Sequence, residues 1–180
     1  MGGTVVITFI SGGARSGKSS IAEADVLSRT SNAVYIASSR YTDEEMSERI
    51  RHHRRTRSDC FTTVEAGFRV KEALAGMEEE AAGVLDCLTV WLSEALFTEK
   101  LDEQKIMKEA TAWVDIIEKR RLYVTIVSND VNEAGLPSND SVYFYVHILE
   151  KLHRFFIQHA ENVIQVRAGF PKVWKGGIGQ

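Results

Sequence analysis

The sequence predicts an α/β fold of three layers, in which a mostly parallel central sheet carries helices on both faces. Strand-like and helix-like segments alternate along the chain, and this pattern is typical of parallel strands joined by helical crossovers. Some of the strand-like segments are apolar at nearly every position, which indicates strands buried on both faces. Since no linker, repeat or low-complexity tract divides the 180 residues, we expect one domain over residues 1–180.

In the first part of the chain, apolar and β-branched runs predict strands, and runs of helix formers with apolar residues on one face predict helices. The expected order is strand 4–10, helix 20–27, strand 32–37, helix 43–57 and strand 61–65. The helix start at Asp43 is supported by Glu44 and Glu45, because carboxylates in a first turn interact favourably with the helix dipole.

The second part of the chain continues the alternation. The expected order is helix 70–82, strand 83–88, helices 90–97 and 103–119, strand 122–127, helix 142–159 and strand 162–167. In the first of these helices the apolar residues recur at helical spacing, at Val70, Leu74 and Met77. Residues 169–180 form a glycine-rich C-terminal tail, which we expect to be mostly irregular.

Between the first strand and the first helix lies a glycine-rich loop with the pattern G-x-x-x-x-G-K-S. Its residues are Gly12, Gly13, Ala14, Arg15, Ser16, Gly17, Lys18 and Ser19. In this context the main-chain N–H groups of such a loop cradle phosphate oxygens, and the helix dipole faces the same anion. Lys18 is then placed to reach the β- and γ-phosphates, and Ser19 to bind Mg²⁺. We therefore predict a P-loop NTPase-like fold that binds ATP or GTP; the alternative is a chance match in a glycine-rich turn.

Ligands of open parallel sheets bind beyond the carboxyl ends of the strands. This rule places several predicted nucleotide-binding residues on one rim with the loop: Ala37, Ser38, Ser39, Glu65 and Asp86, with Ser128 and Asn129 nearby. Asp86 ends an apolar strand, where its carboxylate can hold Mg²⁺ and neutralise charge that develops in phosphoryl transfer. We predict that Ser19 and Asp86 hold the metal and that Lys18 and Asp86 are catalytic. The alternative for Asp86 is a cap on the following helix.

The segment 51–57 concentrates arginines and two histidines in a mildly acidic chain. Arginines bind phosphates through charge-assisted hydrogen bonds, and a neutral imidazole is a competent nucleophile towards phosphorus. His52 and His53 are therefore candidates for a covalent nucleotidyl intermediate. The alternatives are a solvated basic helix face and a weak nucleic-acid contact. His153, by contrast, falls within the apolar series of its helix, and we interpret it as a packing residue.

Composition limits the class of protein. The net charge of −3 gives no general reason to expect a nucleic acid or a membrane surface as partner. No apolar run approaches the roughly 20 residues that span a bilayer, and the residues before the first strand lack the basic region of a signal peptide. Cys60 and Cys87 are too few and too far apart for a metal framework. These features predict a cytoplasmic protein with reduced thiols.

Taken together, these motifs resemble the bifunctional adenosylcobinamide kinase/adenosylcobinamide-phosphate guanylyltransferase family of cobalamin biosynthesis. The resemblance runs in order through nearly the whole chain, starting with a phosphate loop that is more specific than the general pattern. The segments that carry it are 12–19, 35–38, 43–46, 49–53, Glu65, 85–91, 127–131 and 168–171.

This resemblance implies an enzyme with two activities. As a kinase, it would phosphorylate the aminopropanol hydroxyl of adenosylcobinamide, a corrinoid, with a nucleoside triphosphate. As a guanylyltransferase, it would transfer GMP from GTP to the new phosphate through a guanylyl-histidine, and the residue that matches this histidine is His52. Glu65 matches a residue near the guanine nucleotide, and Mg²⁺ would neutralise the departing pyrophosphate. The family's assembly also implies a homotrimer.

Departures from the family pattern gather in the second half of the chain. Glu94, Asp130 and Asn132 stand where asparagine, glutamate and glycine are usual. The segment 143–159 lacks the family's usual arginine, aspartate, glycine and asparagine–glutamine pattern. Two alternatives therefore stay open: a divergent P-loop kinase or nucleotidyltransferase with another acceptor, and a non-catalytic nucleotide-binding subunit.

Overall fold

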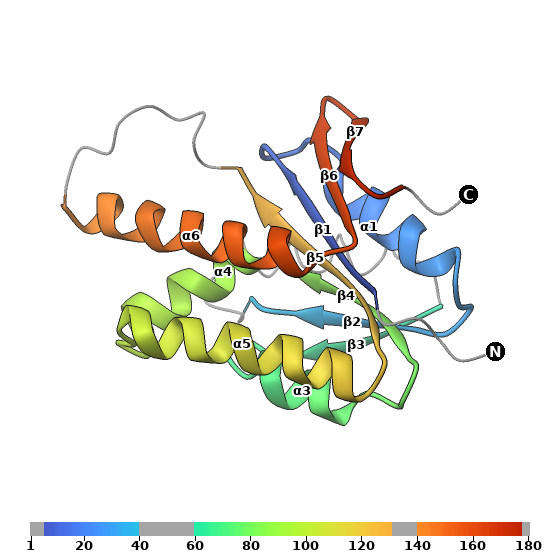
Figure 1. Cartoon of the computed structure of the whole chain (residues 1–180), viewed down its shortest axis with the longest axis horizontal. Coiled ribbons are helices and arrows are strands. Elements are labelled where there is room, and N and C mark those ends of the chain that lie inside the picture. Colours follow the sequence, from blue (N-terminus) through green and yellow to red (C-terminus); the bar gives the residue numbers. More distant parts are fainter. Residues whose placement is uncertain (1–5, 40–59, 131–139, 178–180) are drawn as a thin grey trace, which may run out of the picture.

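A seven-stranded sheet forms the centre of the computed structural model, which describes residues 6–39, 60–130 and 140–177 (Figure 1). The strands lie in the order β3-β2-β4-β5-β1-β6-β7. Their bounds are β1 (Val6–Gly12), β2 (Ala33–Ala37), β3 (Phe61–Glu65), β4 (Ala82–Asp86), β5 (Tyr123–Asn129), β6 (Asn162–Arg167) and β7 (Phe170–Lys175). Every neighbouring pair is parallel except β6 and β7. The predicted mostly parallel α/β architecture is therefore confirmed.

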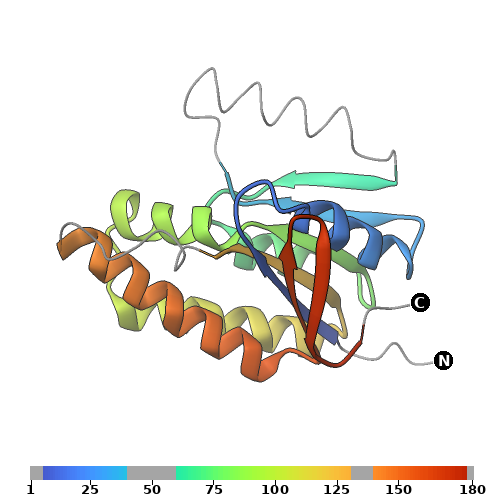
Figure 2. The same ribbon diagram turned by 90° about the horizontal axis from the view of Figure 1, so that it is seen from above.

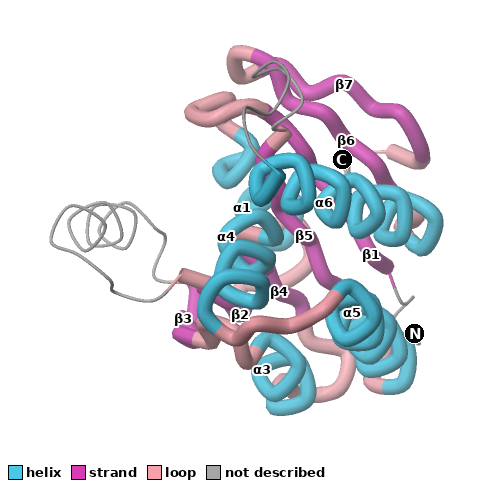
Figure 3. The backbone as a smooth tube through the Cα atoms, turned by 90° about the vertical axis from the view of Figure 1, so that its left-hand side faces the viewer, coloured by secondary structure: helices cyan, strands magenta, loops and turns pink. Residues whose placement is uncertain are grey.

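Helices cover both faces of this sheet. They are α1 (Lys18–Leu27), α3 (Val70–Gly76), α4 (Leu88–Ser93), α5 (Glu103–Lys119) and α6 (Asp140–His159), and α4 continues into a π-helical turn, η1 (Glu94–Thr98). In Figure 3, α1 lies on one side of the sheet and α3, α5 and α6 lie on the other. Phe9 packs in the core under α3 to α6, whereas its neighbour Ile10 packs in the core under α1. Burial on both faces explains the nearly continuous apolar runs of the central strands.

Several predicted boundaries are confirmed to the residue, and others move. The bounds of β3, α5 and β6 are those expected from the sequence. Helix α3 ends at Gly76, earlier than expected, because Met77 is extended, with φ −68° and ψ 149°. Strand β4 ends at Asp86 because α4 begins at Leu88. The helix expected at 43–57 lies outside the described residues. No helix in the described ranges is long and apolar enough to cross a lipid bilayer.

Six of the nine described residues of the C-terminal tail form a strand, so the expectation of a mostly irregular tail is wrong. β7 pairs antiparallel with β6, and Figure 2 shows the two strands as a red hairpin. The turn between them uses Ala168 at φ 48° and Gly169 at φ 83°, in the left-handed region that tight turns require. Pro171 is tolerated because β7 is an edge strand, where a missing N–H leaves no neighbouring strand unpaired.

His153 connects α6 to the centre of the sheet. Its Nε2 lies 2.7 Å from Ser128 Oγ on β5, and its ring packs edge-on against Phe9 of β1 at a centroid distance of 5.2 Å. Burial lowers the pKa of His153 to about 4, and the charge of Asp130 opposes this shift. The imidazole is therefore neutral at pH 7, and its contacts are those of the packing residue expected from the sequence.

We expect the free energy of unfolding of the His153→Asn variant to depend less on pH than that of the wild type. The pKa of His153 is about 4 in the folded protein and about 6.5 in the unfolded chain, so the unfolded chain binds the proton first as the pH falls. The contribution to the free energy of unfolding is fully present above about pH 6.5 and is lost towards pH 4, by up to about 1.4 kcal/mol per pH unit.

Urea unfolding between about pH 4 and 8 measures this difference. His147→Asn removes an exposed histidine from the same helix and is the matched control. If the free energy of unfolding changed with pH equally in His153→Asn and in the wild type, the expectation would be contradicted.

Candidate active site

The phosphate loop joins β1 to α1 in the strand–loop–helix arrangement expected from the sequence. Arg15 at φ 59° and Gly17 at φ 91° lie in the left-handed region, which turns the loop back towards the helix. Gly12 has no room for a side chain: an added Cβ would lie 2.6 Å from both Ser16 Oγ and the main-chain oxygen of Val166. The glycine at this position is therefore required by a close approach of β6 to the loop.

The side chain of Lys18 lies within the loop. It is only 8% exposed, and its Nζ donates to the carbonyl oxygen of Gly13 at 3.1 Å. An ammonium group held in such a partly desolvated place attracts anions more strongly than one in bulk water. This position suits the predicted contact of Lys18 with the terminal phosphates of a nucleotide.

Asp86 lies within hydrogen-bond reach of the loop, although it is far from it in sequence. Ser19 Oγ donates to Asp86 Oδ2 at 3.2 Å, and the Tyr35 hydroxyl donates to the same oxygen. The contact spans β5, which lies between β1 and β4. The alternative role of Asp86 as a helix cap is not observed, because the N-cap of α4 is Cys87, which makes no side-chain capping bond.

Ser19 and Asp86 fit the predicted magnesium ion. A hydroxyl and a carboxylate are oxygen ligands of the kind that Mg²⁺ prefers. Within the described part of the chain, no group of three or more His, Cys, Asp or Glu side chains could hold a metal ion. One carboxylate and one hydroxyl suit an ion that takes its remaining ligands from water and nucleotide phosphates. The donor set therefore fits a metal–nucleotide complex.

The other predicted nucleotide-binding residues lie at the ends of β2 and β3. Ser38 is fully buried, and its hydroxyl donates to Cys87 O and accepts from Cys87 N–H, both at 2.8 Å. Its side chain thus joins β2 to β4. Ala37 is buried, Ser39 is half-buried, and Glu65 is exposed and in register with Ala37. β4 and β5 separate β2 from β1, and Ala37 is in register with Asp86, so this group lies along the rim on the far side of Asp86 from the loop.

A polar network at the ends of β4 and β5 was not expected from the sequence. Asn129 Nδ2 donates to Thr89 Oγ1 at 3.0 Å, and Thr89 Oγ1 lies 3.0 Å from Cys87 Sγ. The hydroxyl of Tyr145 on α6 donates to Thr89 O at 2.9 Å. Burial, reinforced by Asp86, raises the pKa of the Cys87 thiol, so this thiol stays protonated at pH 7. Sequence reasoning named Asn129 because it follows the end of a predicted strand, whereas no local sequence pattern assigns Thr89 or Tyr145 to this network.

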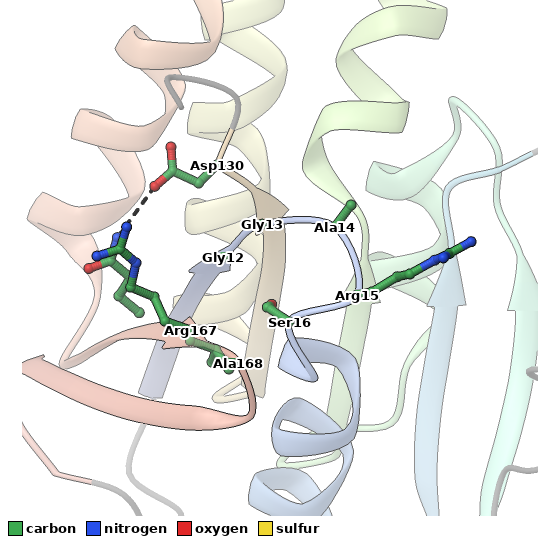
Figure 4. A pocket seen from close by; sticks show the side chains of 10 residues that line it. Gly12, Gly13, Ala14, Arg15, Ser16, Asp130, Arg167 and Ala168 are labelled. Atoms are coloured by element: carbon green, nitrogen blue, oxygen red, sulfur yellow. Dashed lines mark hydrogen bonds between the residues drawn. The ribbon is translucent and has the colours of Figure 1, made fainter. Parts of the chain in front are cut away.

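A cavity of about 320 Å³ opens beside the loop, on the side of β6 (Figure 4). The loop residues 12–16 form one wall, and Asp130, Gln165 and Arg167 form the other. The candidate nucleophile His52 and the basic segment 51–57 lie outside the described residues. The described centre therefore consists of a phosphate loop, a Ser19–Asp86 pair that fits a metal ion, and this adjoining cavity, which together suit phosphoryl transfer.

The chain is similar in sequence to enzymes of a known family. The chain matches the family described as cobinamide kinase / cobinamide phosphate guanyltransferase over residues 8–173. The bifunctional adenosylcobalamin biosynthesis protein CobP of Pseudomonas aeruginosa is 32% identical over 169 residues, which cover 93% of this chain and 96% of the relative. The bifunctional adenosylcobalamin biosynthesis protein CobU of Escherichia coli is 28% identical over 176 residues, which cover 91% of this chain and 97% of that relative.

Solved structures with the same fold are distant in sequence. The flagellar accessory protein FlaH of Methanocaldococcus jannaschii superposes with a TM-score of 0.52 at 13% identity, covering 97% of this chain and 80% of FlaH. The RadB recombinase superposes with a TM-score of 0.51 at 14% identity, covering 91% of this chain and 74% of RadB. At this identity the likeness concerns the fold alone, and it agrees with the predicted P-loop NTPase-like architecture.

We expect Gly12→Ala to lower the free energy of unfolding by about 1–3 kcal/mol, because the added methyl group would force the loop and β6 apart. Gly13→Ala is the matched control, since a Cβ added there meets no atom within 4 Å. Urea unfolding without nucleotide measures both variants. Equal stabilities of the two would show that the approach of β6 does not restrict the loop.

Proposed function

This chain belongs to the cobinamide kinase / cobinamide phosphate guanyltransferase family, and from that premise we propose that it catalyses both reactions on adenosylcobinamide in cobalamin biosynthesis. In the first reaction ATP or GTP phosphorylates the aminopropanol hydroxyl of the corrinoid. In the second reaction GMP passes from GTP to the phosphate just formed. The observation that carries the proposal is the Ser19–Asp86 contact beside Lys18, because a pure nucleotide-binding subunit would not need this catalytic set.

The kinase reaction uses the loop in the way its geometry suggests. Main-chain N–H groups of the loop and Lys18 bind the β- and γ-phosphates, and Lys18 stabilises the charge that moves to the leaving β-phosphate. Ser19 and Asp86 would hold Mg²⁺, which would neutralise further charge on the phosphate oxygens. The hydrogen bond from Tyr35 keeps the Asp86 carboxylate oriented towards Ser19.

The guanylyl transfer uses His52 as nucleophile. A neutral imidazole nitrogen of His52 attacks the α-phosphorus of GTP, the bond from that phosphorus to the α–β bridging oxygen breaks, and pyrophosphate leaves with the electron pair. An oxygen of the corrinoid phosphate then attacks the same phosphorus and releases His52. The arginines of the segment 51–57 suit the stabilisation of these phosphates. Glu65, exposed at the end of β3, is the residue that we assign to the guanine nucleotide.

We expect His52→Ala to abolish the covalent GMP adduct while the kinase reaction continues, because the two reactions need different nucleophiles. Intact-protein mass after incubation with GTP and Mg²⁺ measures the adduct. His53→Ala is the matched control and should label like the wild type. A GMP-sized increment retained in His52→Ala would place the nucleophile elsewhere.

Lys18→Ala provides the contrast in the same experiment. Since both reactions place phosphates in the loop, this variant should lose adduct formation and kinase turnover together, each by about 100-fold or more. Lys105→Ala, which changes an exposed lysine on α5, should keep both. Normal turnover in Lys18→Ala would rule out the proposed use of the loop.

The family resemblance also leads us to propose that the enzyme works in the cytoplasm and assembles as a homotrimer. Light scattering after size exclusion should then give about three times the 20.2 kDa mass of one chain. A mass equal to that of one chain at micromolar concentration would contradict the trimer.

A further inference from the structure

The cavity beside the phosphate loop has a preformed shape. Its two walls are joined by main-chain contacts: Gly169 N–H donates to Ser16 O at 2.8 Å, and Asp130 N–H donates to Gly12 O at 2.9 Å. The close approach of Val166 O at Gly12 adds a third contact between the walls. Because these contacts involve backbone atoms, the position of the cavity relative to the loop does not depend on side-chain rotamers.

The cavity borders the end of the loop where a terminal phosphate would lie. Lys18 reaches the β- and γ-phosphates in loops of this type, and here its Nζ lies 3.1 Å from the carbonyl oxygen of Gly13. Gly13 itself lines the cavity. Gly12 is in register with Asn129, the last residue of β5, so Asp130 follows directly at this end of the loop. A group in the cavity would therefore lie beside the phosphates that the loop binds.

The cavity wall carries groups suited to an acceptor. Figure 4 shows the side chains of Asp130 and Arg167 on the same side of the loop, whereas Arg15 points away from them. The Asp130 carboxylate accepts a hydrogen bond from the Gln165 amide at 3.4 Å, which orients it. Ser16 lines the cavity and is 6% exposed, and its hydroxyl makes no hydrogen bond within the described structure. A buried hydroxyl in this state is stabilised by a ligand that bonds to it.

We propose that this cavity is the subsite for the reacting hydroxyl of the corrinoid acceptor, with Asp130 as its general base and Arg167 as the cation that holds the phosphate product. The assignment rests on the proposed kinase function. The acceptor oxygen bonds to the γ-phosphorus while the bond from that phosphorus to the β–γ bridging oxygen breaks. The nucleoside diphosphate leaves with the electron pair, and the hydroxyl proton passes to the Asp130 carboxylate.

The same arrangement serves the second reaction. Once the hydroxyl has become a phosphate monoester, the Arg167 guanidinium can bind its oxygens through charge-assisted hydrogen bonds. Asp130 has no part in the attack of a histidine on GTP, because that step transfers no proton from an acceptor hydroxyl. Asp130 is therefore specific to the kinase reaction, and this separates its role from that of Lys18.

The test compares Asp130→Asn with the wild type in kinase turnover on adenosylcobinamide, nucleotide affinity and GMP adduct formation. We expect kinase kcat to fall by about 100-fold or more, with nucleotide Kd within about twofold and the adduct unchanged. Asp130→Glu keeps a carboxylate and should retain more turnover than Asp130→Asn. Asp115→Asn, at an exposed site on α5, is the matched control.

Arg167→Gln tests the phosphate role separately. It should weaken binding of adenosylcobinamide phosphate by about tenfold and leave nucleotide Kd unchanged. Arg154→Gln, on the exposed face of α6, should change neither.

Near-normal kinase kcat in a folded Asp130→Asn protein would overturn the assignment of the cavity and leave the proposed function standing. Parallel loss of nucleotide affinity and adduct would also overturn it, since the cavity would then belong to the nucleotide. A wild-type protein that forms the adduct but never phosphorylates cobinamide would overturn the kinase function and, with it, this subsite.

Discussion

The close contact between the phosphate loop and the β6–β7 hairpin is the constraint on which this end of the molecule depends. Gly12 allows the carbonyl of Val166 to lie against the loop, and Gly169 N–H donates to Ser16 O at 2.8 Å. The shape of the loop and the position of the hairpin are therefore linked. The left-handed turn at Gly17 then directs Lys18 and Ser19 towards the carboxyl end of the sheet, where the phosphates of a nucleotide would lie.

The order of the strands supplies the second constraint. Because β5 separates β1 from β4, the Asp86 carboxylate meets Ser19 across one strand, at 3.2 Å, and the two oxygens lie close enough together to bind the same metal ion. The end of β5 lies between β1 and β4. Asn129 turns towards Thr89 on one side, and Asp130 faces the cavity on the other. The last residue of β5 and the residue that follows it thus serve two different parts of the site.

The elements that sequence reasoning identified correctly are those with a strong local signal. The 17 residues of α5 combine an apolar face with an Asp102 side chain that caps Lys105 N–H, and both features can be recognised without the fold. The C-terminal tail shows the opposite case. Its glycines and Pro171 oppose a strand locally, and β7 forms because β6 offers it an edge to pair with. Sequence reasoning also left Asp86 with two roles. The position of Cys87 at the N-cap of α4 removes the capping role, and the metal role stays a prediction.

By itself, the sequence determined the alternation of strands and helices, the phosphate loop and the resemblance to a bifunctional family, because hydrophobic periodicity, turn residues and loop motifs are properties of short segments. The tertiary structure decided which strand lies between the loop and Asp86, how the β6–β7 turn meets the loop, and that Asp130, Gln165 and Arg167 line one cavity with it. The physical reason is that these contacts join residues far apart in sequence through strand order and register. Both depend on the pairing and burial of the whole sheet, which no short segment specifies.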